Sequence, residues 1–173
     1  MALFSIPELK YEAQRLGVLS NSFYANELKK SATESSYDQR FHVFMSHSIR
    51  DAAVVFTLKT KIENMGYSVY IDWDVDGQLD HSRVDKETAL LIRARMQNCS
   101  CLFFSTSDNS PNSKWMPWEL GYFDALKGRV AILPLSEYSP ANYDFYNGQE
   151  YLGLYPYVTI GPNMEKENWL WNH

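Results

Sequence analysis

A tryptophan and a glutamate four residues apart, Trp115 and Glu119, are the pair in this chain whose types and spacing best suit chemistry. They lie in the stretch 113–128, whose helix-forming residues, early proline and final glycine predict a helix. At that spacing the indole and the carboxylate share one helical face, close to a helix N-terminus that favours an ionised carboxylate. An aromatic plate beside an anchored carboxylate suits a ligand with both a flat ring and a sugar. The alternative is a core tryptophan beside a solvated glutamate.

The elements that must position this pair follow from a regular alternation of strand and helix patterns. Apolar runs typical of strands lie at residues 41–46, 67–71, 99–105, 130–135 and 155–160. Between the first four of these runs, apolar residues recur at helical spacing. Connections of helix length between strands predict a parallel sheet covered on both faces. We therefore expect an α/β, flavodoxin-like three-layer fold with a five-stranded parallel sheet.

Two capping boxes mark predicted helix starts. Ser48 with Asp51, and Ser82 with Asp85, have the spacing at which a serine and an acidic residue satisfy the first amides of a helix. The sequence therefore predicts one helix after the first strand and another before the third.

The predicted topology brings three distant segments together. In open parallel sheets ligands bind beyond the carboxyl ends of the strands, where the strand order reverses. For the order 2-1-3-4-5 that point lies between the first and third strands, whose ends are residues 45–48 and 105–107. The helix carrying Trp115 and Glu119 follows the third strand. We expect the three segments to form one crevice.

The composition bounds the function. The chain has 173 residues, 45% of them hydrophobic and 21% charged, which is typical of one globular domain. A formal net charge of −5 disfavours a broad contact with nucleic acid. No apolar run approaches the length of a membrane span and no basic leader opens the chain, so we expect no membrane partner and a cytoplasmic protein.

The only two cysteines, Cys99 and Cys101, lie on a predicted buried strand. Residues two apart on a strand point to the same face, so both are expected there as reduced core residues in the cytosol. Because no second cysteine pair and no histidine cluster accompany them, zinc is disfavoured and no metal site is predicted.

The first 40 residues differ from the rest of the chain. They contain two short helical patterns, at 7–16 and 23–30, and a polar stretch at 31–39. We interpret residues 1–40 as a helical N-terminal extension and linker that packs on the domain or mediates assembly. Residues 41–173 form the domain, with an apolar tail at 169–171 that is expected to pack on its body.

Four segments resemble the TIR (Toll/interleukin-1 receptor) domain family, and its bacterial branch most closely. Residues 41–47 (FHVFMSH) resemble the first box, residues 66–72 (GYSVYID) the second strand, and the segment to Arg83 the BB loop. Trp115 and Glu119 match the WxxxE signature. His42 departs from the acidic residue common at its position, and the loop to Arg83 has no proline, unlike the BB loop of animal Toll receptors. The sequence is similar to the TIR proteins of Thoeris antiphage defence systems.

The resemblance implies a five-stranded parallel sheet and cleavage of NAD⁺ at the nicotinamide–ribose bond. Several bacterial members cyclise the product into ADP-ribose isomers that act as signals. NAD⁺ would then be a substrate, with no separate cofactor, and the expected partners are further copies of the chain and a downstream effector reached through a nucleotide signal. The alternatives are a non-catalytic TIR scaffold that acts through assembly, and another glycosidic-bond enzyme such as a nucleoside transferase.

Cleavage of NAD⁺ assigns roles to the residues of the crevice. Nicotinamide leaves as a neutral pyridine, so no general acid is needed, and a fixed carboxylate can stabilise the oxocarbenium-like charge on the ribose. Glu119 is the candidate catalytic residue. The expected substrate-binding residues around it are aromatic walls, strand-end polar groups and residues of the loop after the second strand: Trp115, Trp118, Phe44, Ser46, His47, Ser105, Asp72 and Arg83. The alternative for His47 is a surface loop residue.

The loop after the second strand opens like a calcium-binding loop. Asp72, Asp74, Asp76 and Gly77 have that spacing, but the twelfth position, where a bidentate glutamate is required, is Arg83. A strand pattern also precedes the loop where a helix is needed. We interpret the loop as an acidic lid flanking the crevice, with Arg83 near the phosphates or at a subunit contact.

Overall fold

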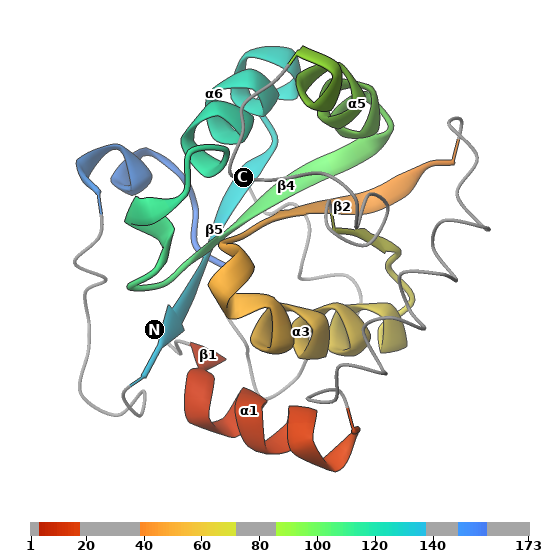
Figure 1. Ribbon diagram of the computed structural model, residues 1–173. Coiled ribbons are helices and arrows are strands. Elements are labelled where there is room, and N and C mark those ends of the chain that lie inside the picture. The colour runs from red at the N-terminus through yellow and green to blue at the C-terminus, as the bar shows by residue number, and fades with distance from the viewer. Residues whose placement is uncertain (1–3, 18–38, 72–85, 138–148, 159–173) are drawn as a thin grey trace.

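A five-stranded parallel sheet with helices on both faces forms the body of the protein (Figure 1). The computed structural model describes residues 4–17, 39–71, 86–137 and 149–158. Its strands lie in the order β1-β5-β4-β2-β3. The predicted α/β, flavodoxin-like fold is confirmed.

The described elements follow the predicted alternation. The strands are β1 (Phe4–Ser5), β2 (Phe41–Ser46), β3 (Val69–Tyr70), β4 (Cys99–Thr106) and β5 (Val130–Ser136). The helices are α1 (Ile6–Arg15), α3 (Ala52–Asn64), α5 (Lys86–Gln97) and α6 (Met116–Lys127), with 3₁₀ turns η1 (Ile49–Asp51), η2 (Ser110–Asn112) and η4 (Glu150–Leu154). The predicted features at 23–30, at 82–85 and at 169–171 lie outside the described residues, as does the linker 31–39 except for its last residue.

The centre of the sheet has the predicted order. Strand β2 pairs with β3 on one side and with β4 on the other, so the topological switch lies between β2 and β4. Ser46, the last residue of β2, is in register with Phe104. The carboxyl ends of these two strands therefore meet where the crevice was expected.

The edge of the sheet beside β5 differs from the prediction. The expected strand at 155–160 is in the described part only a bridge, in which Tyr157 pairs in parallel with Ile132. The flanking bonds run from the Ile132 amide to the Pro156 carbonyl and from the Val158 amide to the Ile132 carbonyl. Proline has no amide hydrogen and cannot extend a ladder on both sides. The rest of this edge is taken by β1, which pairs with Leu135 and Ser136.

The N-terminal residues are thus part of the layered body. The predicted helix at 7–16 is α1, which Ser5 caps by accepting a hydrogen bond from the Glu8 amide at 3.4 Å. Helix α1 packs on α3, where the Lys61 ammonium lies 2.7 Å from the Glu12 carboxylate. The division into residues 1–40 and 41–173 remains a prediction. The described part of residues 1–40 adds β1 to the sheet and packs α1 on α3.

Each face of the sheet has its own apolar core. The first core lies under α1 and α3 and includes Val43 and Met45, whereas the second lies under α5 and α6 and includes Phe44. This parity follows from the alternation of side chains along β2. The same alternation determines which face of the sheet each residue near the strand ends lies on.

The two cysteines do not share one environment, contrary to the prediction. Both thiols are free and buried, but Cys101 belongs to the core under α1 and α3 and Cys99 to the core under α5 and α6. Cys99 starts its strand two residues after the end of α5, so it packs with that helix. Desolvation raises the pKa of each thiol to about 12.

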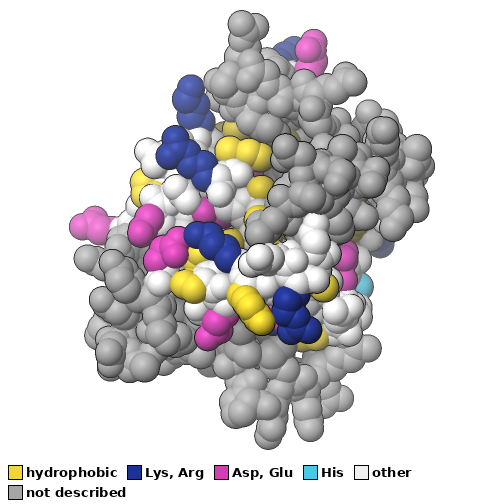
Figure 2. Space-filling view, turned by 60° about the horizontal axis from the view of Figure 1, so that its bottom comes forward, with side chains coloured by type: hydrophobic (Ala, Val, Ile, Leu, Met, Phe, Trp, Pro, Cys, Tyr) yellow, Lys and Arg dark blue, Asp and Glu magenta, His cyan; other side chains and the backbone are white. Residues whose placement is uncertain are grey.

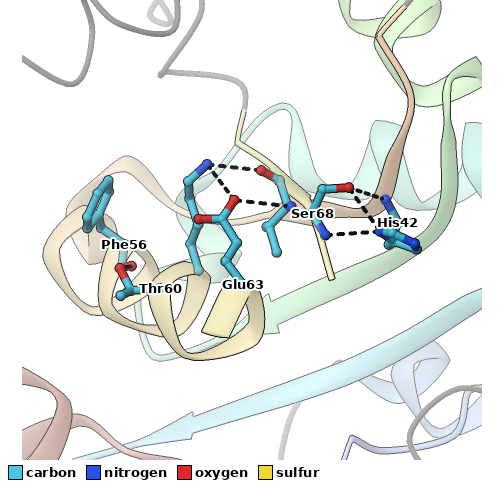
Figure 3. A network of polar contacts seen from close by, with 7 residues as sticks. His42, Phe56, Thr60, Glu63 and Ser68 are labelled. Atoms are coloured by element: carbon cyan, nitrogen blue, oxygen red, sulfur yellow. Dashed lines mark hydrogen bonds and ion pairs between the residues drawn. The ribbon is translucent and has the colours of Figure 1, made fainter. Parts of the chain in front are cut away.

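Side chains of α3 and β2 hold the short strand β3 in place (Figure 3). Ser68 donates its backbone N–H to His42 Nδ1 at 3.0 Å and accepts the His42 amide on its Oγ at 3.1 Å. Because an amide can only donate, Nδ1 of this imidazole is the acceptor and is unprotonated. Lys59 bridges the Val69 carbonyl and the Glu63 carboxylate, both at 3.1 Å. These contacts lie at the opposite end of β2 from Ser46.

Candidate active site

The Glu119 carboxylate is buried against the end of β2. Its side chain is 2% exposed, and Oε2 accepts a hydrogen bond from Ser46 Oγ at 2.6 Å. The bond joins two residues 73 positions apart in the sequence. The predicted meeting of the first strand end with the helix of the Trp–Glu pair is therefore present, and the alternative of a solvated glutamate does not hold.

Helix α6 places Glu119 in its first turn. Ser113 Oγ accepts a hydrogen bond from the Met116 amide at 3.2 Å, and the Glu119 amide donates to the Trp115 carbonyl at 2.9 Å. Pro117 lies where a missing amide hydrogen costs nothing. The carboxylate thus lies at the positive end of the helix dipole.

The two indoles differ in exposure. Trp115 is 6% exposed and belongs to the core under α5 and α6, whereas Trp118 is half-buried. Their rings meet edge to face at 5.5 Å, and Trp118 stacks on Tyr122 at 5.8 Å. Trp118 is therefore the indole that the structure leaves accessible, and Trp115 supports it from the core.

Within the described residues, the indole N–H of Trp115 has no hydrogen-bond acceptor. A buried donor left without an acceptor costs on the order of 1–3 kcal/mol. A ligand or a water molecule that supplied an acceptor would recover that free energy.

Phe44 and His47 are both buried near the end of β2. Phe44 is fully buried in the core under α5 and α6, where its ring centroid lies 5.4 Å from that of Tyr70, so it has no surface exposed to a ligand. His47 is 8% exposed, and its Nδ1 lies 3.2 Å from the Met45 carbonyl oxygen, to which it donates. His47 is therefore buried, and the alternative that it is an exposed loop residue does not hold.

Ser105 is not brought to Glu119. Its hydroxyl is buried and donates to Met45 Sδ at 3.0 Å, in the core under α1 and α3. Strand alternation places the next residue, Thr106, on the face of Phe104 and Ser46. The expected hydrogen bond from Ser105 into the crevice does not fit this position. The alternation of apolar side chains along β4 was the sequence signal that places Thr106, and not Ser105, on the face of the sheet that carries Ser46.

The predicted capping box after β2 is only half right. Ser48 Oγ accepts from the Arg50 amide at 3.4 Å, as expected of a cap. Asp51 makes no side-chain cap to α3 and instead binds the loop after β4. The sequence pattern predicted that Asp51 would cap a helix, whereas in the structure its carboxylate binds Ser107 and Asn109.

The remaining predicted site residues, Asp72 and Arg83, lie outside the described residues. Among the described residues no group of three His, Cys, Asp or Glu side chains could hold a metal ion. None of the helices in the described ranges is long and apolar enough to cross a membrane.

A cavity of about 520 Å³ lies on the other side of the sheet from Glu119, beside α1. Tyr11, Glu12, Arg15 and Lys61 are among its lining residues. On this face of the molecule basic and acidic side chains are interspersed (Figure 2). The sheet separates this cavity from Glu119, so the cavity is not part of the site around that carboxylate.

Comparison with known proteins identifies the family. The chain is 47% identical over 178 residues to the probable 3' cyclic ADP-D-ribose synthase ThsB' of Bacillus cereus (strain MSX-D12), an alignment that covers 98% of this chain and 91% of that protein. This chain belongs to the Thoeris-type TIR family. The resemblance inferred from the sequence boxes is confirmed.

A second TIR relative matches more locally. The putative cyclic ADP-D-ribose synthase TIR2 of Cytobacillus dafuensis is 29% identical over 98 residues, which is 56% of this chain and 26% of that protein. No protein-family model matches the chain.

Proposed function

We propose that this TIR protein cleaves NAD⁺ at the nicotinamide–ribose bond and converts the ADP-ribose part into a cyclic signal in Thoeris antiphage defence, within the cytoplasm. The observation that carries the proposal is the buried Glu119 carboxylate, held by Ser46 at the N-terminus of α6. The names of both relatives, as cyclic ADP-D-ribose synthases, support it.

Glu119 acts on the charge that develops as nicotinamide leaves. The departing group becomes neutral while the ribose becomes an oxocarbenium-like cation, so an anion beside the ribose stabilises the transition state more than the substrate. Burial strengthens this attraction, because a low-dielectric surrounding screens it less than water does. The Ser46 hydrogen bond holds the carboxylate in one orientation, so little reorganisation is needed during the reaction.

The exposure of each side chain determines the substrate-binding role that we propose for it. Trp118, stacked on Tyr122, is the aromatic surface we assign to a base of NAD⁺, and Phe44 and Trp115 support it from the core. His47 and Ser46 contribute polar groups at the strand end. Asp72 and Arg83 are proposed on sequence grounds alone. No cofactor beyond the NAD⁺ substrate is required.

A cyclic product follows from the competition for the ribose cation. A well-oriented intramolecular nucleophile reaches an effective molarity of about 10⁵ M or more, well above any concentration of free water. An aromatic-walled crevice favours folding of the adenosine part back onto the cation. The product would then reach a downstream effector as a diffusible nucleotide.

The burial of Glu119 supports a requirement for activation. At 2% exposure the carboxylate meets NAD⁺ only after neighbouring groups move. We propose that self-association, or an infection-linked trigger that promotes it, supplies the free energy for that movement.

The second candidate function is a scaffold that assembles without catalysis. A scaffold gains nothing from a carboxylate buried at a strand end, since taking a charge out of water is costly. The burial of Glu119 therefore favours the enzyme.

One incubation separates these functions. The full chain is incubated with NAD⁺ over a range of protein concentrations, and the products are separated by chromatography and weighed by mass spectrometry. We expect nicotinamide together with a product one water lighter than linear ADP-ribose. Linear ADP-ribose alone would leave an NAD⁺ hydrolase, and intact NAD⁺ under all conditions would favour the scaffold.

A further inference from the structure

The Asp51 carboxylate is a buried anion that the proposed chemistry does not use. It lies at the end of η1, five residues after Ser46, and is 6% exposed. Ser107 Oγ donates to its Oδ2 at 2.5 Å and Asn109 Nδ2 donates to its Oδ1 at 2.6 Å. Both carboxylate oxygens are therefore engaged by the loop that follows β4.

Hydrogen bonds continue from these two residues through the loop. Ser107 Oγ also accepts from the Asn109 amide at 3.1 Å, and the Ser107 amide donates to Ser110 Oγ at 2.7 Å. The Ser113 amide then donates to the Ser110 carbonyl at 3.0 Å. Since Ser113 Oγ accepts from the first amide of α6, at Met116, the chain of bonds ends at the start of that helix.

The segment from Ser46 to Asp51 therefore holds Glu119 in two ways. Ser46 binds its carboxylate directly, and Asp51 holds the loop from which α6 begins. We propose that Asp51 is a positioning residue, which fixes the start of α6 so that Glu119 is presented to Ser46 and the ribose. The effect on turnover rests on the proposed NAD⁺-cleaving function, whereas the effect on the loop does not.

Two simpler roles do not account for Asp51. Its side chain makes no capping bond to α3, although it is the residue that precedes that helix. With both oxygens bonded inside the protein it is also not placed to bind substrate. Its hydrogen bonds reach Ser107 and Asn109, which are 56 and 58 positions away in the sequence. Asp51 therefore fixes the loop after β4 relative to the segment after β2.

The test compares Asp51→Ala with Asp51→Asn in the full-length protein. Alanine removes both bonds, so the kcat for nicotinamide release should fall by about 10- to 100-fold while KM stays within about twofold. An asparagine oxygen can still accept from Asn109 and its amide can donate to the Ser107 hydroxyl, so Asp51→Asn should recover most of the kcat. Asn109→Ala, which removes one bond, should fall between them, and it replaces Asp51→Ala if that variant does not fold.

Leu58→Ala is the matched control for stability, because Leu58 is a buried residue of α3 in the core under α1 and α3. It should lower the thermal midpoint without lowering kcat at temperatures where the protein is folded. Equal losses of kcat in Leu58→Ala and Asp51→Ala at equal thermal midpoints would overturn the proposal. A wild-type kcat in folded Asp51→Ala would overturn it too.

Hydrogen exchange provides a readout that does not depend on activity. Amides from Ser107 to Glu119 should exchange faster in Asp51→Ala, while those of α3 should not change. Unchanged exchange in the loop would overturn the proposed positioning role even if NAD⁺ were cleaved. An inactive wild-type protein whose loop loosens in Asp51→Ala would contradict the proposed function and support the positioning role.

Discussion

The Glu119 carboxylate accepts the Ser46 hydroxyl at 2.6 Å and is 2% exposed. Glutamine keeps the shape and an oxygen acceptor for Ser46 but removes the charge. We expect Glu119→Gln to fold normally and to lose nicotinamide release by at least about 10²-fold, the scale of one preorganised electrostatic contact.

Glutamine is a sharper test at this position than alanine. Glu119→Ala would leave Ser46 without its acceptor and open a cavity, so a loss of activity could reflect instability. Normal turnover by a folded Glu119→Gln protein would contradict the assigned role. The comparison requires equal thermal midpoints for the variant and the wild type.

The two thiols provide a test of burial at the residue scale. Burial raises the pKa of Cys99 and of Cys101 from 9.0 to about 12. Both thiols therefore stay protonated near pH 8, and the folded protein should not react with a thiol reagent that titrates two groups after denaturation. Rapid labelling of the native protein would contradict this.

The same shifts predict how stability changes with pH. Above pH 9 the unfolded thiols ionise while the folded ones remain protonated, so the unfolded state binds fewer protons. The free energy of unfolding should then fall as pH rises from 9 towards 12, by up to about 1.4 kcal/mol per pH unit for each thiol. Denaturant titrations at several pH values, with Cys99→Ala and Cys101→Ala as controls, measure this slope.

At the scale of one element, α6 offers a matched pair of glycines. Gly128 ends the helix with φ of 62° and donates to the Asp124 carbonyl, whereas Gly121 lies inside the helix with open space around it. Alanine is strained at a positive φ but favours a helix interior. Gly128→Ala should therefore lower the free energy of unfolding by about 1 kcal/mol, and Gly121→Ala should raise it by about 0.5–1 kcal/mol.

Denaturant unfolding of both variants measures these opposite effects. A loss of stability in Gly121→Ala would mean that the exposed face of α6 makes a contact in solution. Equal effects of the two substitutions would contradict the role of Gly128 as the helix end.

At the scale of the whole molecule, catalysis by a buried carboxylate should depend on assembly. If association opens the site around Glu119, the activity per chain should rise with protein concentration and should track the fraction of assembled chains. Activity assays paired with sedimentation at the same concentrations test this. A monomer that turns over NAD⁺ at a concentration-independent rate would show that the opening occurs within one chain.

The sequence by itself determined the features that depend on local geometry. Strand and helix periods predicted β2, β4, β5, α3 and α6, because these spacings follow from the backbone alone. The four-residue spacing of Trp115 and Glu119, and the boxes around β2 and β3, were enough to indicate the TIR family. The meeting of the end of β2 with α6, where Ser46 binds Glu119, followed from the predicted strand order.

Only the tertiary structure decided which distant groups become partners. A two-residue strand such as β1 has no period to detect, and its place beside β5 depends on how the chain returns to the sheet edge. Asp51 matched a local capping pattern, but it binds residues more than 50 positions away that satisfy both of its oxygens. The burial of Glu119 likewise results from packing between α6 and β2. Local spacing is fixed by the backbone, whereas burial and hydrogen-bond partners depend on which elements pack together.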